Sequence, residues 1–243
     1  MNTVIATIGL PQLALCFVPV AITLIVFYRW SMNTANALYA LSRMLLQLLL
    51  IGYVLAYIFE ASSSVLVILV LLVMLLSSSW IALGPVGGER KSLLFYSLLA
   101  IATGGGLTLL VVTQCVLVLK PWYQASYMIP LAGMAFANAM TAVSLAGERL
   151  YAELEHQRSW VDARHTAFQA AMIPVINSLF AVGLVSLPGM MTGQILSGVP
   201  PEVAVRYQIM VMCMIFAAAG LSTAVFLSLA GRVSNPGIQV DAR

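Results

Sequence analysis

The chain has 243 residues, of which 62% are hydrophobic and only 8% are charged, and its mean hydropathy is +1.01. Soluble domains carry about 25% charged residues, so this composition excludes a water-soluble enzyme, and a net charge of only +3 gives no sign of a nucleic-acid binder. The charges cluster between apolar stretches long enough to cross a bilayer as helices. We therefore predict an all-α, polytopic transmembrane helical bundle, formed as a single domain over residues 1–243.

Seven stretches of about 20 residues or more have the length and composition of membrane spans. In chain order they are approximately Ile8–Tyr28, Asn36–Phe59, Ser64–Leu83, Leu93–Leu119, Tyr127–Leu145, Ala167–Leu196 and Val203–Ala230. A polar segment, Gly147–Arg164, separates the fifth span from the sixth and has the pattern of a helix. It is either a linker helix lying on the bilayer surface or a docking surface for a cytosolic partner, and the composition does not choose between the two.

The sixth predicted span contains an unusual number of helix-breaking residues. Pro188 and Gly189 are adjacent, with Pro174 and Gly183 before them. Proline in a helix interior removes a hydrogen bond and clashes with the preceding turn. The pair Pro188-Gly189 therefore predicts a kinked or broken helix, which at membrane depth is tolerated only beside protein or a water-filled cavity.

Basic residues in the connecting loops predict the orientation, because lysine and arginine favour the cytosolic side. With seven spans, one side receives eight of them: Arg29, Arg90, Lys91, Arg149, Arg158, Arg164, Arg232 and Arg243. The opposite side receives Lys120 and Arg206. We expect the N-terminus outside and the C-terminus in the cytosol, so that Gly147–Arg164 is the largest cytosolic element.

Catalytic motifs are missing from the sequence. It contains neither a GxxxxGK[ST] phosphate loop nor an HExxH zinc motif, and no Asp or Glu lies in the middle of a span. His156 and His165 are interpreted as surface histidines, and the three cysteines as residues that pack in apolar surroundings. We predict that the chain is not an enzyme and holds no cofactor of its own.

A few polar side chains remain within the predicted spans. Arg43 and Gln47 lie one turn apart on one helix face. The Arg43 side chain either extends to the lipid headgroups at the membrane surface or has a functional role within the membrane. Asn138, Gln194 and Gln208 are expected to bridge neighbouring helices. The abundant methionines are interpreted as packing residues rather than as ligands of a soft metal.

One block is more specific than any of these patterns. Residues 182–212 read VGLVSLPGMMTGQILSGVPPEVAVRYQIMVM, and matching blocks lie at 43–54 and 129–140. In these blocks and their spacing, the chain resembles the bacterial iron-export ABC permease family, which has plant relatives linked to aluminium tolerance.

The resemblance implies a permease subunit, expected as a homodimer in the bacterial inner membrane, that exports iron or another metal species. A separate cytosolic subunit would bind ATP. The substrate pathway would involve Arg43, Gln47, Asn138, Asn177, Ser186, Pro188, Gly189, Thr192 and Gln194. The ATPase would be coupled through Glu148, Arg149, Glu153, Arg158 and Arg164. No metal ligands are assigned.

The chain also departs from the family pattern in two places. Similar sequences have a longer cytosolic segment than Gly147–Arg164, and they tend to carry an acidic residue where Asn177 stands and a lysine near Phe180. The short segment motivates an alternative function, a stand-alone carrier or channel that does not use ATP.

Overall fold

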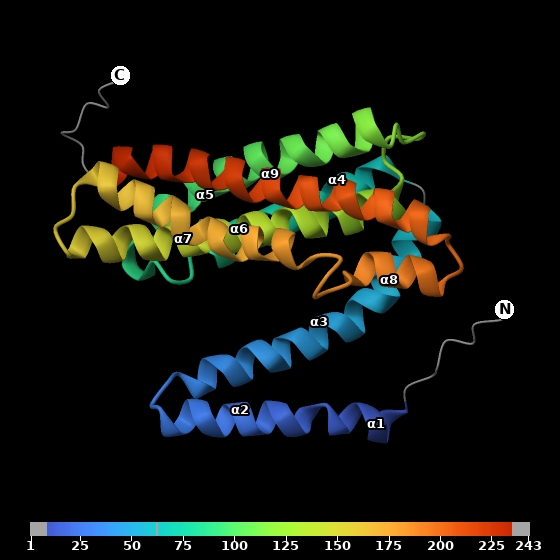
Figure 1. Ribbon diagram of the computed structural model, residues 1–243, viewed down its shortest axis with the longest axis horizontal. Coiled ribbons are helices and arrows are strands. Elements are labelled where there is room, and N and C mark those ends of the chain that lie inside the picture. Colours follow the sequence, from blue (N-terminus) through green and yellow to red (C-terminus); the bar gives the residue numbers. More distant parts are fainter. Residues whose placement is uncertain (1–8, 62, 235–243) are drawn as a thin grey trace. The chain divides into compact units, whose positions relative to one another are not determined.

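The computed structural model describes residues 9–61 and 63–234 (Figure 1). The chain divides into two compact units, residues 1–61 and 62–243. Each unit is described by itself. Two positions used above, Ile8 at the start of the first predicted span and Arg243 at the end of the chain, lie outside the described residues.

The first unit is a helical hairpin. Its first arm consists of α1 (Leu10–Leu15) and α2 (Phe17–Arg29), separated at Cys16, and its second arm is α3 (Thr34–Ala61). The turn between the arms is closed by the side chain of Asn33, whose Oδ1 accepts a hydrogen bond from the backbone N–H of Asn36 at 3.0 Å, as a helix N-cap does. Neither α1 nor α2 contains a buried residue.

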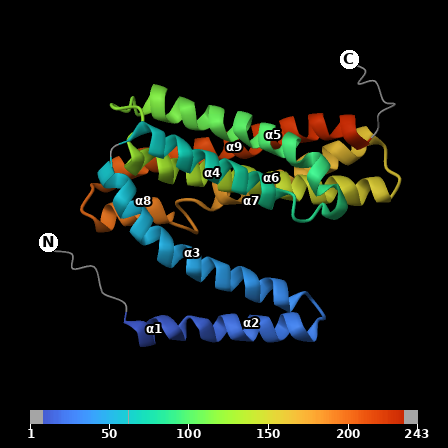
Figure 2. The same ribbon diagram turned by 180° about the vertical axis from the view of Figure 1, so that it is seen from behind.

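The second unit is a bundle of longer helices with short connections. Its elements are α4 (Ser64–Ala82), the 3-10 turn η1 (Gly87–Glu89), α5 (Arg90–Leu110), the π-helical turn η2 (Val111–Val116), α6 (Ala125–Glu155), α7 (Trp160–Ala181), α8 (Gly189–Leu196) and α9 (Pro201–Ser234). Helix α6 packs against α4, α5, α7 and α9, and the most extensive contact joins α5 to α9 (Figures 1 and 2).

Small residues allow α5 and α9 to approach closely. A Cβ atom on Gly104 of α5 would lie 2.8 Å from the Cα of Ser222 on α9, a separation that packed atoms do not adopt. A Cβ atom added to Gly105 would lie 3.0 Å from Cδ1 of the Phe136 ring on α6. Helices in a bilayer associate mainly through such close van der Waals packing, because lipid is as apolar as their side chains. These glycines and the buried alanines of α6 and α9 therefore define the core of the second unit.

The predicted fold class is confirmed, since the described residues form long apolar helices. Among the described residues, six helical stretches are long and apolar enough to cross a membrane, and they correspond to the first five and the seventh of the seven predicted spans. The sixth predicted span differs from the others. It was expected as one stretch, Ala167–Leu196, but the structure divides it into α7 and α8 and begins α7 at Trp160. The predicted break at Pro188-Gly189 is thus present, and the helix already ends seven residues before Pro188, at Ala181.

The polar segment Gly147–Arg164 is not a separate helix. Helix α6 continues through it to Glu155, a turn covers residues 156–159, and α7 begins at Trp160. The predicted helical character is confirmed for residues 147–155 and 160–164. They do not form one separate helix, because the charged residues after Gly147 extend α6 beyond its apolar part. The α6–α7 turn is therefore a helix-to-helix connection at the end of the bundle (Figure 1).

Within the second unit, basic residues gather at one end. The α4–α5 connection, the α6–α7 turn and the end of α9 lie together, opposite the α5–α6 and α8–α9 connections (Figure 1). The first group of connections carries Arg90, Lys91 and Arg158, whereas Lys120 belongs to the opposite group. This asymmetry is the one on which the predicted orientation depends.

Candidate functional site

The break between α7 and α8 is an ordered turn. The backbone N–H groups of Val185 and Ser186 both donate to the carbonyl of Ala181, at 2.8 and 3.1 Å. Gly183 adopts the left-handed region at φ +84°, and its N–H donates to the carbonyl of Ser186 at 2.9 Å. Backbone groups freed by the end of α7 are thus satisfied locally, which is the condition for a broken helix at membrane depth.

Pro188 defines the start of α8. Its extended backbone, at φ −62° and ψ 145°, places it at the N-cap position of the helix. The hydroxyl of Thr192 donates to the Pro188 carbonyl at 3.1 Å. Proline has no N–H that needs a partner and its φ is fixed. Pro188 can therefore end the turn and begin α8 without leaving a backbone N–H unpaired.

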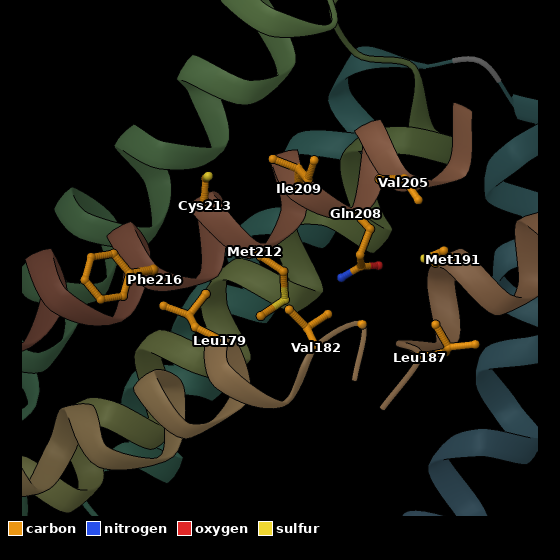
Figure 3. Close-up of a pocket in the computed structure, with 11 residues that line it drawn as sticks. Leu179, Val182, Leu187, Met191, Val205, Gln208, Ile209, Met212, Cys213 and Phe216 are labelled. Atoms are coloured by element: carbon orange, nitrogen blue, oxygen red, sulfur yellow. The ribbon is translucent and has the colours of Figure 1, made fainter. Parts of the chain in front are cut away.

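A cavity of about 440 Å³ lies beside the break. The end of α7, the turn, α8 and the first half of α9 all contribute to its wall (Figure 3). The lining residues are Leu179, Val182, Gly183, Leu187, Met191, Val205, Gln208, Ile209, Met212, Cys213 and Phe216. We call this space the break cavity.

One polar side chain projects into the break cavity. Gln208 on α9 is only 5% exposed, and its amide points between Val182 and Met191 (Figure 3). Its Oε1 is buried and has no hydrogen-bond partner among the described residues. Leaving a buried amide oxygen unpaired costs about 1–3 kcal/mol, so this atom is expected to acquire a donor when the site is occupied.

The lining carries no charged side chain. Besides Gln208, the side-chain heteroatoms of its lining residues are the sulfurs of Met191, Met212 and Cys213. Among the described residues, no group of three or more His, Cys, Asp or Glu side chains is placed to hold a metal ion. The break cavity can therefore enclose apolar surface and one hydrogen-bonding group, but it offers no carboxylate to a hard cation.

The predicted pathway residues near the break are not among the residues that line the cavity. Pro188 and Gly189 form the junction to α8, and Ser186 supplies a carbonyl to the turn. The hydroxyl of Thr192 is already bonded to Pro188. Gln194 is half-buried with an unpaired Oε1, but it does not belong to the wall of the break cavity.

The remaining pathway candidates lie elsewhere. Asn138 on α6 is half-buried and donates from Nδ2 to the Met134 carbonyl of its own helix at 2.8 Å. Asn177 is exposed on α7. Arg43 and Gln47 are both exposed on α3 of the first unit. Within the second unit, the structure thus brings together only the candidates near Pro188.

Gln208 was interpreted from the sequence as a helix-bridging residue, and its place in the cavity wall was missed. The available signal was its helical register on α9, where Val205 and Met212 stand three residues before and four residues after it. Residues at these separations share one helix face. An amide flanked by apolar residues on that face could therefore have been identified as the polar feature of an apolar surface.

Of the predicted coupling residues, one lies in the α6–α7 turn and the others lie on the adjoining ends of α6 and α7. Glu153, whose side chain is 12% exposed, pairs with Arg149 one helical turn earlier and with Arg158 across the turn at 3.7 Å. Ser159 caps α7, since its Oγ accepts from the N–H of Asp162 at 3.2 Å. Glu148 is exposed and takes part in no ion pair among the described residues.

Arg164 belongs to a neighbouring groove. This groove, of about 420 Å³, lies between the start of α7 and the last turns of α9. Its wall includes Asp162, Arg164 and His165 together with Phe168 and Leu227. The end of the bundle that carries the α6–α7 turn therefore presents mixed charge over an apolar floor.

These features define the chain as a multi-pass, all-α membrane protein with a broken helix beside an open, mostly apolar cavity. Residues 10–233 match the family described as "Uncharacterised protein family (UPF0014)". Because this match spans nearly the whole chain, the protein belongs to the UPF0014 family.

Curated relatives show the same relationship. The chain is 34% identical to a UPF0014 membrane protein of Synechocystis, over 78% of this chain and 79% of the relative. It is 33% identical to the Probable iron export permease protein FetB of Escherichia coli, over 87% and 86% of the two chains. It is 31% identical to Protein ALUMINUM SENSITIVE 3 of Arabidopsis thaliana, over 88% and 83%. No solved structure matches the chain significantly.

Proposed function

We propose that the protein is the permease subunit of an ABC-type exporter that moves iron or another metal species out of the cytosol. The observation that carries this proposal is the similarity to the Probable iron export permease protein FetB along 87% of the chain. That share includes the block that folds as the broken α7–α8 segment. Many transporters place their substrate sites at discontinuous helices, where irregular backbone lines a cavity.

The energy source would be a separate subunit. The sequence lacks a phosphate loop, so ATP would bind to a cytosolic partner and this chain would hold no cofactor. The α6–α7 turn is the surface we propose for contact with that partner, because it lies at the basic end of the second unit and Glu153 links Arg149 to Arg158. Such ion pairs make the turn a defined element that can transmit movement to α7.

The proposed assembly has two permease chains and two ATP-binding subunits in the bacterial inner membrane. The N-terminus would lie outside and the C-terminus in the cytosol. This orientation places the α6–α7 turn and the α4–α5 connection, with Arg90 and Lys91, on the cytosolic side, in agreement with the preference of basic loops.

Co-purification tests the transporter assignment. The tagged permease is extracted in mild detergent from cells that express the ATP-binding subunit encoded nearest to it, and the ratio of the two chains is measured. We expect a stable complex, with reduced recovery of the ATPase when Arg158 is changed to Glu and unchanged recovery when the exposed Lys120 at the opposite end of the second unit is changed to Glu. Recovery of the permease alone, under conditions that preserve known ABC complexes, would contradict the proposal.

Total metal content in a deletion strain, measured by mass spectrometry, then tests the cargo, with increased cellular iron as the expected result.

A second candidate function follows from the shortness of the α6–α7 connection, in which only residues 156–159 lie outside helices. A stand-alone carrier or channel would need no coupling element. Reconstitution of the purified chain into liposomes separates the two functions, because flux of metal without ATP supports the carrier and an absence of flux until the ATPase is added supports the exporter.

A further inference from the structure

The break cavity differs from the other apolar hollows of the second unit. Grooves of about 520 and 850 Å³ lie along α9, one against α5 and the other against α7. The polar residues of these grooves are either exposed, as Arg206 and Gln169 are, or paired, as Thr108 is with the Gly104 carbonyl at 2.9 Å. Acyl chains can fill such surfaces without leaving a polar atom unsatisfied. Of these three spaces, only the break cavity is lined by a residue with an unpaired buried oxygen, which is Oε1 of Gln208.

The chemistry of the wall limits what can occupy the break cavity. A hard divalent cation requires charged or multiple oxygen ligands, and the wall supplies one amide oxygen and no charge. The volume of about 440 Å³ is within the range of pockets for small organic molecules, which are mostly apolar with a few placed polar groups. The unpaired atom is an acceptor, so a matching molecule must provide a hydroxyl or N–H donor.

We propose that the break cavity binds an uncharged organic molecule whose apolar body packs against the wall and whose hydroxyl or N–H group donates to Oε1 of Gln208. A metal species would pass through this space only inside a neutral organic complex of that kind. The role of the molecule as cargo rests on the proposed transport function, whereas its binding to the purified chain does not.

Cys213 provides a way to observe occupancy. It lines both the break cavity and the groove against α5, and it is exposed, as are Cys16 and Cys115; dependence of protection on Gln208 therefore assigns that protection to the break cavity. Changing Cys16 and Cys115 to Ala leaves one thiol, whose rate of alkylation by N-ethylmaleimide can be followed by mass spectrometry. A molecule seated in the cavity is expected to slow this reaction.

The decisive comparison uses two probes that differ in one hydrogen-bond donor, 1-pyrenemethanol and 1-methylpyrene. In the single-cysteine protein we expect 1-pyrenemethanol to protect Cys213 at a roughly tenfold lower concentration, as expected for about one buried hydrogen bond. Gln208→Leu should remove this difference by weakening protection by 1-pyrenemethanol only. Gln114→Leu, which changes a glutamine outside the break cavity, should preserve the tenfold difference.

Other outcomes would overturn the inference. Equal protection by the two probes in the protein that retains Gln208 would indicate an acyl-chain groove, and this comparison needs no variant at Gln208. Protection by Fe²⁺ under anaerobic conditions, with none by either probe, would indicate a cation site. Because no ATPase is present in this assay, its result is independent of the co-purification experiment, and either proposal can fail while the other stands.

Discussion

The contact between α5 and α9 and the break between α7 and α8 lie in the same unit, but they differ in how closely their elements pack. At the first, Gly104 lies so close to Ser222 that a single added methyl group would meet backbone atoms. At the second, a cavity of about 440 Å³ separates the elements, and Leu184 and Val185 in the turn are 91% and 84% exposed.

The difference between these regions separates what holds the bundle together from what can move. Helices in a membrane gain stability from close packing of small residues, and packed interfaces deform little. The break has few packed neighbours, and a backbone turn absorbs changes in φ and ψ more readily than a helix does. We infer that α5, α6 and α9 form the fixed part of the second unit, and that the turn with α8 is the part able to rearrange around a ligand.

The largest effect is expected at the close contact. Gly104→Ala would place a Cβ atom 2.8 Å from the Cα of Ser222, and overpacking of this kind costs about 1–3 kcal/mol. Gly106→Ala is the matched control, because its Cβ would meet nothing within 4 Å and alanine favours the helix by about 1 kcal/mol. SDS-induced unfolding in mixed micelles measures both. Equal stability of the two variants would show that the α5–α9 contact is not the fixed part of the bundle.

A smaller effect is expected at the break. Gly183→Ala forces a side chain into the left-handed region at φ +84°, which costs about 1–2 kcal/mol. Because the break is not part of the tightly packed core, we expect the cost to appear as a change in the turn rather than as unfolding of the bundle.

Limited proteolysis of residues 182–188 and alkylation of Cys213 are the measurements for this prediction. Both should be faster in Gly183→Ala, while the midpoint of SDS unfolding changes little. Gly193→Ala in α8, which meets nothing within 4 Å, should leave all three unchanged. A large fall in the unfolding midpoint for Gly183→Ala would place the break within the cooperative core.

The sequence allowed the helices and the break to be predicted, but not the cavity. Apolar length identifies a span directly, and Pro188-Gly189 marks an interruption whatever surrounds it. The position of Gln208 in the cavity wall depends on how α9 is rotated against α7 and α8, which is decided by packing between segments distant in sequence. For the same reason, polarity alone selected Thr192, although its hydroxyl bonds to Pro188 within its own segment.

The smallest effect is expected at the α6–α7 turn, and it tests whether this turn behaves like the fixed contact or like the break. Glu153→Gln removes the ion pairs to Arg149 and Arg158. Pairs with exposed arginines contribute at most about 1 kcal/mol, so the unfolding free energy should fall by no more than that. The loss should shrink as salt is raised towards 1 M, where the Debye length falls to about 3 Å. Glu148→Gln, with no ion pair to lose among the described residues, should show no salt-dependent loss. If Glu153→Gln lowers the unfolding free energy by much more and the loss is insensitive to salt, the turn is held by packing that continues from the core. A rigid turn of that kind would transmit a movement imposed by a partner directly to α7.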